Sequence, residues 1–310
     1  MLPSPKLAPG DRVRLIASAN PHDRESLDRA VKVLESWGLT AEVGSYAPDP
    51  ADQLAEINAA LGDAAIRAIV VTGDGAQAYR IADELDFDAA RHDPKPIVGV
   101  AGTTHLHLAL WRECRIGGVY GAIADDADPA DSALIDSAEA LRRTLMTMPP
   151  NTLQPMMSQP NTLQSKTLRS QPDEISASVN APGRATGPLL GGNLTAIRNM
   201  IGAGLPDLDG ALLFLEDRRT IGLGQVDRQL THLRRSGALD GLRGVVLGRF
   251  PGFEGYVDRD WALADVLQDQ LTGLGVPVLG GIRFGGGGDP VPVGAVAVLD
   301  ADEGQLIVGS

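Results

Sequence analysis

The sequence predicts an α/β protein with two domains: a Rossmann-like domain with a parallel sheet, followed by a smaller, mixed and β-rich domain. From residue 10 to about 145, short apolar runs alternate with amphipathic stretches, which is the pattern of βαβ units around a parallel sheet. Between 146 and 185 this pattern gives way to Pro, Gln, Ser, Asn and Thr, and it resumes afterwards. We therefore expect domains at 1–145 and 186–310, joined by a linker.

The elements of the first domain follow from the periodicity of its apolar residues. Residues 26–37 carry apolar side chains at helical spacing and stop at Gly38, a residue suited to a helix C-terminus. Residues 66–71 and 96–101 are apolar enough for strands buried on both faces of a parallel sheet. Two further strands and one further helix are predicted at 13–17, 40–43 and 51–61, respectively.

The segment 146–185 has little apolar material to offset the entropy of ordering it, and it repeats PNTLQ at 150–154 and 160–164. We interpret it as the linker. In the second domain, helices are predicted near 194–201, 226–235 and 261–271, and strands at 211–215, 244–250, 295–299 and 305–308. The DADEG sequence at 300–304 is a turn signal that makes the last two strands a hairpin.

Composition argues against several classes of partner. The net charge of −13 disfavours nucleic acid and anionic membranes, which require clustered Lys and Arg. The chain has no apolar run of about 18 residues, and its opening MLPSPK lacks the apolar region of a secretory signal, so we expect a cytoplasmic protein. The single cysteine, Cys114, fits a reducing compartment and a buried position on a helix.

Five sequence segments stand at junctions between the predicted elements. They are LAPGDRV at 7–13, PKPIVGVAGTTHLH at 94–107, GGNL at 191–194, LFLED at 213–217 with DR at 227–228, and GVVLGRF at 244–250. In this order they resemble motifs of the serine LD-carboxypeptidases, the family of muramoyltetrapeptide carboxypeptidases and microcin-immunity peptidases. The resemblance implies a homodimer without cofactor that removes a terminal D-amino acid from a cell-wall tetrapeptide, using a Ser-His-Glu triad split between two domains.

Carried over residue by residue, the triad is incomplete. The position of the serine holds Ala101, and the following aspartate position holds Gly102. The glutamate is retained as Glu216, whereas the histidine position falls at Gly286, within FGGGGD at 284–289. The family's RGGYG loop is altered to TGDGAQ at 72–77. Without a nucleophile and a base, we expect no serine-hydrolase chemistry.

Three side chains remain as candidates for acid–base chemistry or ligand binding. Glu216 ends a strand at the domain junction, so it is either an acid, base or ligand anchor, or an exposed carboxylate. Asp74 is either a base or cation-binding group, or a turn residue and helix cap. His105 is either a surface residue or a new general base. His107 lies roughly 200° from His105 on a helix, which excludes joint chelation, and is expected to be structural.

Backbone positions complete the predicted site. Those expected to bind the ligand are Gly73, Gly75, Ala101, Gly102, Thr103 and Gly286. Thr103 and Thr104 are more in keeping with helix capping than with a replacement nucleophile. The glycine run at 285–288 lacks the Lys-Ser/Thr of a phosphate-binding loop, although its amides suit a carboxylate. No spacing typical of a metal site is present, and no cofactor or metal is expected.

Three functions follow from these observations. The chain either binds a small peptide or amino-acid-like ligand in the interdomain cleft without hydrolysing it, or uses the same cleft for other acid–base chemistry in a biosynthetic pathway. The sequence does not decide between these two. The third alternative is an active LD-carboxypeptidase whose triad lies at positions other than those assigned above.

Overall fold

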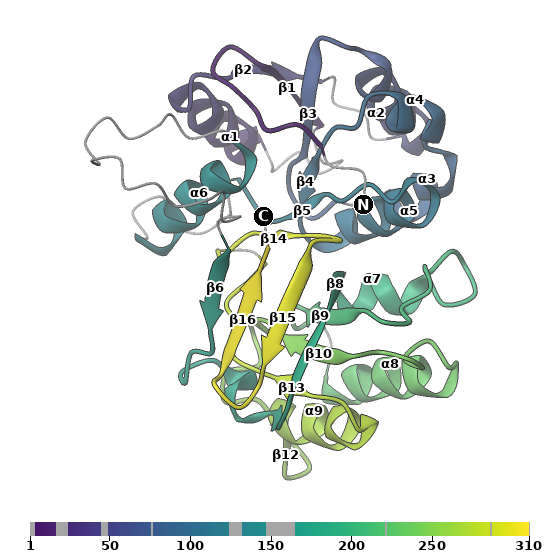
Figure 1. Cartoon of the computed structure of the whole chain (residues 1–310), viewed down its shortest axis with the longest axis vertical. Coiled ribbons are helices and arrows are strands. Elements are labelled where there is room, and N and C mark those ends of the chain that lie inside the picture. The colour runs from purple at the N-terminus through teal and green to yellow at the C-terminus, as the bar shows by residue number, and fades with distance from the viewer. Residues whose placement is uncertain are drawn as a thin grey trace, which may run out of the picture.

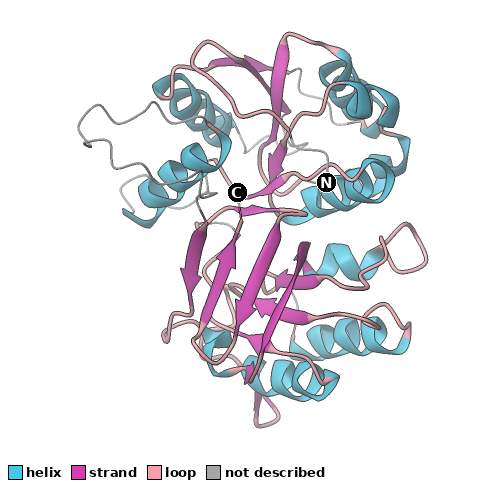
Figure 2. Ribbon diagram, in the orientation of Figure 1, coloured by secondary structure: helices cyan, strands magenta, loops and turns pink. Residues whose placement is uncertain are grey.

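The computed structural model describes residues 4–16, 24–44, 49–75, 77–123, 132–146, 165–220, 222–285 and 287–309. Two sheets lie end to end, with helices on both faces of the first and a stack of α7, α8 and α9 along one side of the second (Figures 1 and 2). The predicted fold class, an α/β protein with a parallel sheet and a second, mixed sheet, is confirmed.

The first sheet has the strand order β14-β5-β4-β3-β1-β2. Its strands from β1 to β5 are parallel, which is the doubly wound order 2-1-3-4-5. The strands are β1 (Arg12–Ile16), β2 (Thr40–Val43), β3 (Ile66–Val71), β4 (Ile97–Gly99) and β5 (Val119–Tyr120). The helices are α1 (Arg24–Ser36), α2 (Pro50–Gly62), α3 (Ala78–Ile81), α4 (Phe87–His92), α5 (Thr104–Cys114) and α6 (Ser132–Leu145).

The strand predicted at 96–101 is shorter than expected. It ends at Gly99, and Ala101–Thr103 form a 3₁₀ turn that leads into α5. Ala101 has a φ of +49°, a left-handed conformation that is uncommon for a residue with a Cβ atom. The apolar run therefore continues past the strand into a strained turn.

The second sheet has the order β6-β16-β15-β8-β9-β10-β13-β7, and β8, β9, β10 and β13 are parallel to one another. The strands are β6 (Lys166–Arg169), β7 (Asn180–Ala181), β8 (Arg184–Asn193), β9 (Leu212–Glu216), β10 (Gly244–Leu247), β13 (Val278–Leu279), β15 (Val296–Asp300) and β16 (Gln305–Val308). The helices are α7 (Leu194–Asn199), α8 (Leu223–Arg235) and α9 (Leu263–Leu271). Trp261, predicted to begin α9, lies instead in a two-stranded hairpin of β11 (Val257–Asp258) and β12 (Trp261–Ala262).

The interpretation of 146–185 as a linker is wrong for residues 165–185. Strand β6 pairs with β16, and β7 pairs with β13, so this segment supplies both edge strands of the second sheet. Residues 147–164 lie outside the described residues. A four-residue strand such as KTLR is too short to show a clear period. The polar composition of the segment therefore led to the prediction of a linker.

Strand β8 was also missed, because Pro188 and its glycines read as loop signals. The first half of β8 pairs antiparallel with β15, and the second half pairs parallel with β9. A Cβ atom on Gly191 would lie 2.0 Å from the carbonyl oxygen of Phe214 on β9, so only glycine allows the two strands to approach. This close pairing sets Asn193 opposite Glu216.

The chain returns to the first sheet near its end. Strand β14 (Val291–Pro292) pairs antiparallel with β5 and forms the edge of the first sheet. The largest hydrophobic core belongs mainly to the second sheet and its helices, yet it includes Leu108, Trp111 and Tyr120 of the first. The two halves of the molecule are therefore joined by one continuous core and by β14, which comes late in the chain but belongs to the first sheet.

Candidate functional site

The carboxyl ends of the parallel strands from both sheets meet at the junction between them. Strand β4 leads to Ala101 and β5 ends at Tyr120, while β8 ends at Asn193 and β9 at Glu216. Ligands of open α/β sheets bind outside the carboxyl ends of the strands. Two surface hollows, of about 400 and 570 Å³, lie instead near the opposite ends of the strands, where Val276 lines both and Arg243 lines the second.

Glu216 is buried at this junction, with 9% of its surface exposed, so the alternative of an exposed carboxylate is wrong. The Tyr120 hydroxyl donates to Glu216 Oε1 over 2.5 Å, and Asn193 Nδ2 donates to the same oxygen over 3.1 Å. The Tyr120 oxygen accepts in turn from the backbone N–H of Ala101 at 3.0 Å. Tyr120 thus connects the turn of the first sheet to the strand end of the second.

The neighbouring carboxylate, Asp217, is fully occupied by donors. Its Oδ1 accepts from Asn193 Nδ2 at 3.0 Å and from the N–H of Arg218 at 2.8 Å. Its Oδ2 accepts from the N–H and the hydroxyl of Thr195, at 3.1 and 2.7 Å. Gln229 Nε2 donates to the Thr195 hydroxyl from helix α8. Asp217 therefore positions the end of β8 and the start of α7.

Burial raises the pKa of Glu216 to about 7, and the charge of Asp217 adds to this effect. The hydrogen bonds from Tyr120 and Asn193 and the charge of Arg218 oppose it. Burial and the adjacent Glu216 raise the pKa of Tyr120 well above its usual value, so Tyr120 remains a neutral donor. A carboxyl that titrates near neutral pH is suited to act as a general acid or base.

The turn at Ala101 is held from both sides. The Thr104 hydroxyl donates to the Ala101 carbonyl over 2.6 Å and accepts from the N–H of Asn193 at 3.0 Å. The helix-capping role predicted for Thr103 and Thr104 is therefore wrong, since Thr103 makes no side-chain cap and Thr104 bridges the turn to β8. A left-handed non-glycine residue fixed in this way is a feature of functional turns.

The altered loop at 72–77 packs directly on this turn. The N–H of Gly102 donates to the carbonyl of Asp74 over 2.7 Å. A Cβ atom on Gly75 would lie 2.5 Å from the N–H nitrogen of Thr103, and Gly73 and Gly75 both have positive φ angles. The structure thus gathers the predicted residues of both loops beside Ala101, whereas Ala76 lies outside the described residues.

His105 lies behind the turn, with Nδ1 3.0 Å from the carbonyl oxygen of Gly102 and its ring 6.1 Å from that of Tyr79. Burial lowers the pKa of His105, which favours its neutral ring. Within the described residues, no hydrogen bond joins His105 to the carboxyl of Glu216. His105 is thus tied to the turn through Gly102, whereas Glu216 is bound by Tyr120 and Asn193.

His107 is fully buried, and its Nε2 lies 3.0 Å from the carbonyl oxygen of Ile97. Burial lowers its pKa from 6.5 to about 4, so folding requires the neutral ring. Because the folded pKa is depressed, this histidine's contribution is complete above pH 6.5 and is lost as the pH falls towards 4. Over that window, the wild-type protein is expected to lose about 3 kcal/mol more unfolding free energy than His107→Gln.

Urea unfolding at several pH values measures this difference as a change in slope, so any constant cost of the substitution cancels. The exposed His232→Gln variant is the matched control for the loss of one imidazole. Equal slopes for wild type and His107→Gln would contradict the assignment of a buried, neutral histidine.

Gly285 lies beside Glu216, and hydrogen bonds between described residues close the neck of the glycine-rich segment that it begins. The N–H of Asp289 donates to the carbonyl of Arg283 over 2.9 Å, and that of Gly288 donates to Gly285 over 3.1 Å. The Ser137 hydroxyl holds the carbonyl of Gly288 at 2.6 Å. Gly286, the predicted histidine position, lies outside the described residues.

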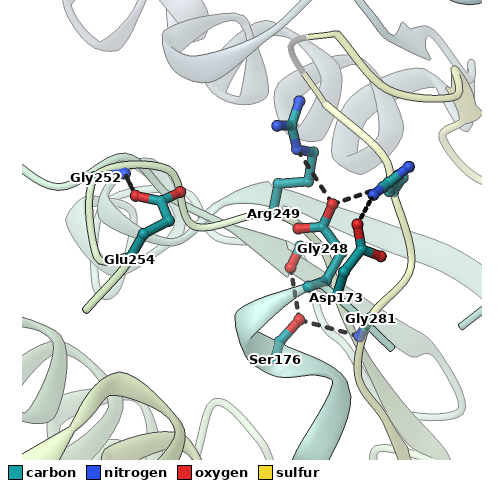
Figure 3. Close-up of polar contacts among 9 residues, drawn as sticks. Asp173, Ser176, Gly248, Arg249, Gly252, Glu254 and Gly281 are labelled. Carbon is teal, nitrogen blue, oxygen red and sulfur yellow. Dashed lines mark hydrogen bonds and ion pairs between the residues drawn. The ribbon is translucent and has the colours of Figure 1, made fainter. Parts of the chain in front are cut away.

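An ion-pair network anchors one side of this neck. Arg283 pairs with Asp173 at 2.5 Å and with Glu174 at 2.7 Å, and Glu174 also lies 3.6 Å from Arg249. Next to the network, the Ser176 hydroxyl donates to the carbonyl of Gly248 and accepts from the N–H of Gly281 (Figure 3). Residues 173–176, which belong to the segment predicted as a linker, therefore support the neck that lies beside Glu216.

Among the residues that the structure describes, no group of three or more His, Cys, Asp and Glu side chains is arranged to hold a metal ion. Among the same residues, no helix has both the length and the apolar character needed to cross a membrane.

Comparison with known proteins gives consistent results. The model of the LD-carboxypeptidase N-terminal domain matches residues 13–121, and that of the C-terminal domain matches residues 186–299. A putative carboxypeptidase of Streptomyces coelicolor is 35% identical, with 97% of this chain and 94% of that protein covered. A probable murein peptide carboxypeptidase of Bacillus subtilis is 27% identical, with 96% and 92% covered.

Solved structures show the same fold. The microcin C7 self-immunity protein MccF in complex with aspartyl sulfamoyl adenosine matches with a TM-score of 0.79 at 21% identity, covering 100% of this chain and 99% of that one. The muramoyltetrapeptide carboxypeptidase of Oxalobacter formigenes matches with a TM-score of 0.75 at 24% identity, covering 96% and 99%.

Proposed function

The chain belongs to the LD-carboxypeptidase family, and we propose that it binds a peptide or amino-acid-derived ligand between Ala101 and Glu216 without serine-type hydrolysis. The observation that carries this proposal is the turn at Ala101. It has the left-handed backbone and the fixed hydrogen bonds of a strained functional turn, and its side chain is a methyl group. A methyl group has no lone pair with which to attack a carbonyl carbon.

The surroundings of Glu216 support the same conclusion. In a serine triad, the acidic residue orients a histidine, which takes the proton of the nucleophile. Here the carboxyl of Glu216 accepts from Tyr120 and Asn193, and no described imidazole donates to it. Removing a triad nucleophile or base costs several orders of magnitude in rate, so two such losses leave negligible peptidase activity.

The class of ligand is inferred from relatives. MccF has been solved with aspartyl sulfamoyl adenosine and with glutamyl sulfamoyl guanosine, both of which contain an amino-acid unit. A further relative is named as a murein peptide carboxypeptidase. A ligand with an amino-acid or short peptide portion at the junction of the two sheets is the proposal that these neighbours support.

A second candidate function, acid–base catalysis in a biosynthetic pathway, is favoured by the pKa of Glu216. A carboxyl with a pKa of about 7 is half protonated at neutral pH and is suited to give and take a proton in one catalytic cycle. This chemistry requires neither a serine nor a histidine. Its substrate would belong to the same ligand class.

One experiment separates these functions. Wild-type protein and Glu216→Gln are incubated with an L,D-tetrapeptide and with extracts of the producing cell, and every mass change is followed by mass spectrometry. We expect the tetrapeptide to stay intact. A product that appears from the extract with wild type but not with Glu216→Gln would establish acid–base catalysis, and no change would favour binding alone.

Release of the terminal D-amino acid by the wild-type protein would overturn the proposal and restore an active carboxypeptidase. The exposed Asp258→Asn variant serves as the matched control, since it also replaces one carboxylate by an amide. Thermal unfolding of the variants verifies that they are folded.

A further inference from the structure

The two oxygens of Glu216 differ in their partners. Oε1 accepts from the Tyr120 hydroxyl and from Asn193 Nδ2, whereas Oε2 has no hydrogen-bond partner among the described residues. The adjacent Asp217 accepts four hydrogen bonds through its two oxygens. Both oxygens of Asp217 therefore have hydrogen-bond donors. Of the four carboxylate oxygens at the junction, only Glu216 Oε2 has no donor among the described residues.

Gly285 lies beside this open position. A Cβ atom on Gly285 would have three atoms of Glu216 as its nearest neighbours: Cγ at 3.5 Å, and Cδ and Oε2 at 3.7 Å. Gly285 has a φ of +97° and no side chain, so among the described residues of this neck its backbone alone lies against the Oε2 side of the carboxyl. The ion pairs of Arg283 and the hydrogen bond from Ser137 fix the loop in this position.

The charges at the junction are unbalanced. Glu216 and Asp217 are both buried, and within the described part of the chain neither forms an ion pair with a Lys, Arg or His side chain. Tyr120 and Asn193 are neutral donors, and Arg218 acts on Glu216 only through its charge, without a hydrogen bond. Burying a carboxylate without a countercharge is costly, so the site favours a cation.

We propose that Glu216 Oε2 receives a cationic nitrogen group of the ligand, such as an ammonium, amidinium or imidazolium group, on the side of the carboxyl that Gly285 flanks. This proposal rests on the proposed function and specifies the ligand as a peptide or amino-acid derivative with a basic nitrogen. The cation donates an N–H to Oε2 while Tyr120 and Asn193 hold Oε1. A charge-assisted hydrogen bond of this kind is stronger than one between neutral groups.

Proton binding to Glu216 competes with binding of the cation. The groups that face the carboxyl are Tyr120 from β5, Asn193 from β8, and Asp217 and Arg218 after β9, and the pKa of Glu216 among them is about 7. A cation requires the ionised form, so its affinity is expected to be about tenfold weaker at pH 6 than at pH 8. A ligand carboxylate bound by the protonated form would show the opposite dependence.

The test uses acetamidinium chloride as the probe and acetamide, its neutral isostere, at matched ionic strength. Binding is followed by NMR, through the backbone amide shifts of Gly285 and Tyr120 in the full-length protein. We expect acetamidinium to bind at least about tenfold more tightly than acetamide, and Glu216→Gln, which keeps an oxygen acceptor for Tyr120 and Asn193, to remove this preference. Asp258→Asn is expected to leave it unchanged.

Equal binding of the two probes, a preference that survives Glu216→Gln, or tighter binding at pH 6 would each overturn the cation site. Such a result would leave the absence of serine hydrolysis standing, because that conclusion depends on the fate of the tetrapeptide. Cleavage of the tetrapeptide by the wild-type protein, in contrast, would overturn the proposed function even if acetamidinium binds.

Discussion

A variant carrying both Ala101→Ser and Gly286→His is expected to react with a fluorophosphonate probe at least about 100-fold faster than the single variant Ala101→Ser. The serine hydroxyl would stand on the left-handed turn that Thr104 and Tyr120 already hold. The imidazole would follow Gly285, whose Cβ position is 3.7 Å from Glu216 Oε2. That oxygen has no described partner and is thus available to orient the ring.

The rate of labelling, followed by intact-protein mass spectrometry, measures the nucleophile independently of any peptide substrate. The triple variant that adds Glu216→Gln is the control, since it retains the serine and the histidine but lacks the negative charge that stabilises the imidazolium. It is expected to fall back towards the rate of Ala101→Ser. If the histidine brings no acceleration, position 286 is not the place from which a base reaches Ala101, and the residue-by-residue assignment of the triad fails.

The unfolding free energy of Glu216→Gln, measured relative to that of the wild type, is expected to rise by about 3 kcal/mol as the pH is raised from 4 to 8. The pKa of Glu216 is about 7 in the folded protein and 4.5 for the unperturbed side chain, so the folded state binds more protons within this window. Stability from Glu216 is therefore complete below pH 4.5 and is lost as the pH rises through 7. A glutamine has no such dependence and keeps the acceptor of both hydrogen bonds.

Urea unfolding of both proteins at several pH values measures this gain, and the difference between the two curves removes all other titrating groups that the proteins share. Asp258→Asn is expected to produce no comparable change of slope. Parallel curves for wild type and Glu216→Gln would show that Glu216 titrates normally, which would also remove the support for acid–base catalysis.

Much of the fold follows from periodicity in the sequence. The strands at 40–43, 66–71 and 305–308 are found at the predicted bounds, because each is an apolar or alternating run closed by turn residues. Strand β8 and the edge strands β6 and β7 were missed. Strands β6, β7 and the first half of β8 pair with strands more than 90 residues away, and the second half of β8 depends on glycines that permit close packing on β9; local composition reveals neither.

The candidate site was predictable only in part. Motif order placed Glu216 and the loops at Gly75 and Gly102 together, because parallel strands bring their carboxyl ends to one edge. Tyr120, which joins the two halves of the site, was missed. Its partner Glu216 lies 96 residues further along the chain, and no local pattern at Val119 marks a buried hydroxyl. Asn193 belongs to the GGNL motif, but its contacts with both carboxylates could not be predicted, because they depend on the register of β8 on β9.

The pairing of β14 with β5 constrains the order in which the protein folds during synthesis. Until residues 291 and 292 leave the ribosome, β5 is an open edge whose N–H and C=O groups are available to another chain. The first sheet is thus completed only after six of the eight strands of the second have been made. A nascent chain stalled before this strand is expected to aggregate, whereas in the finished molecule β14 covers this edge of β5.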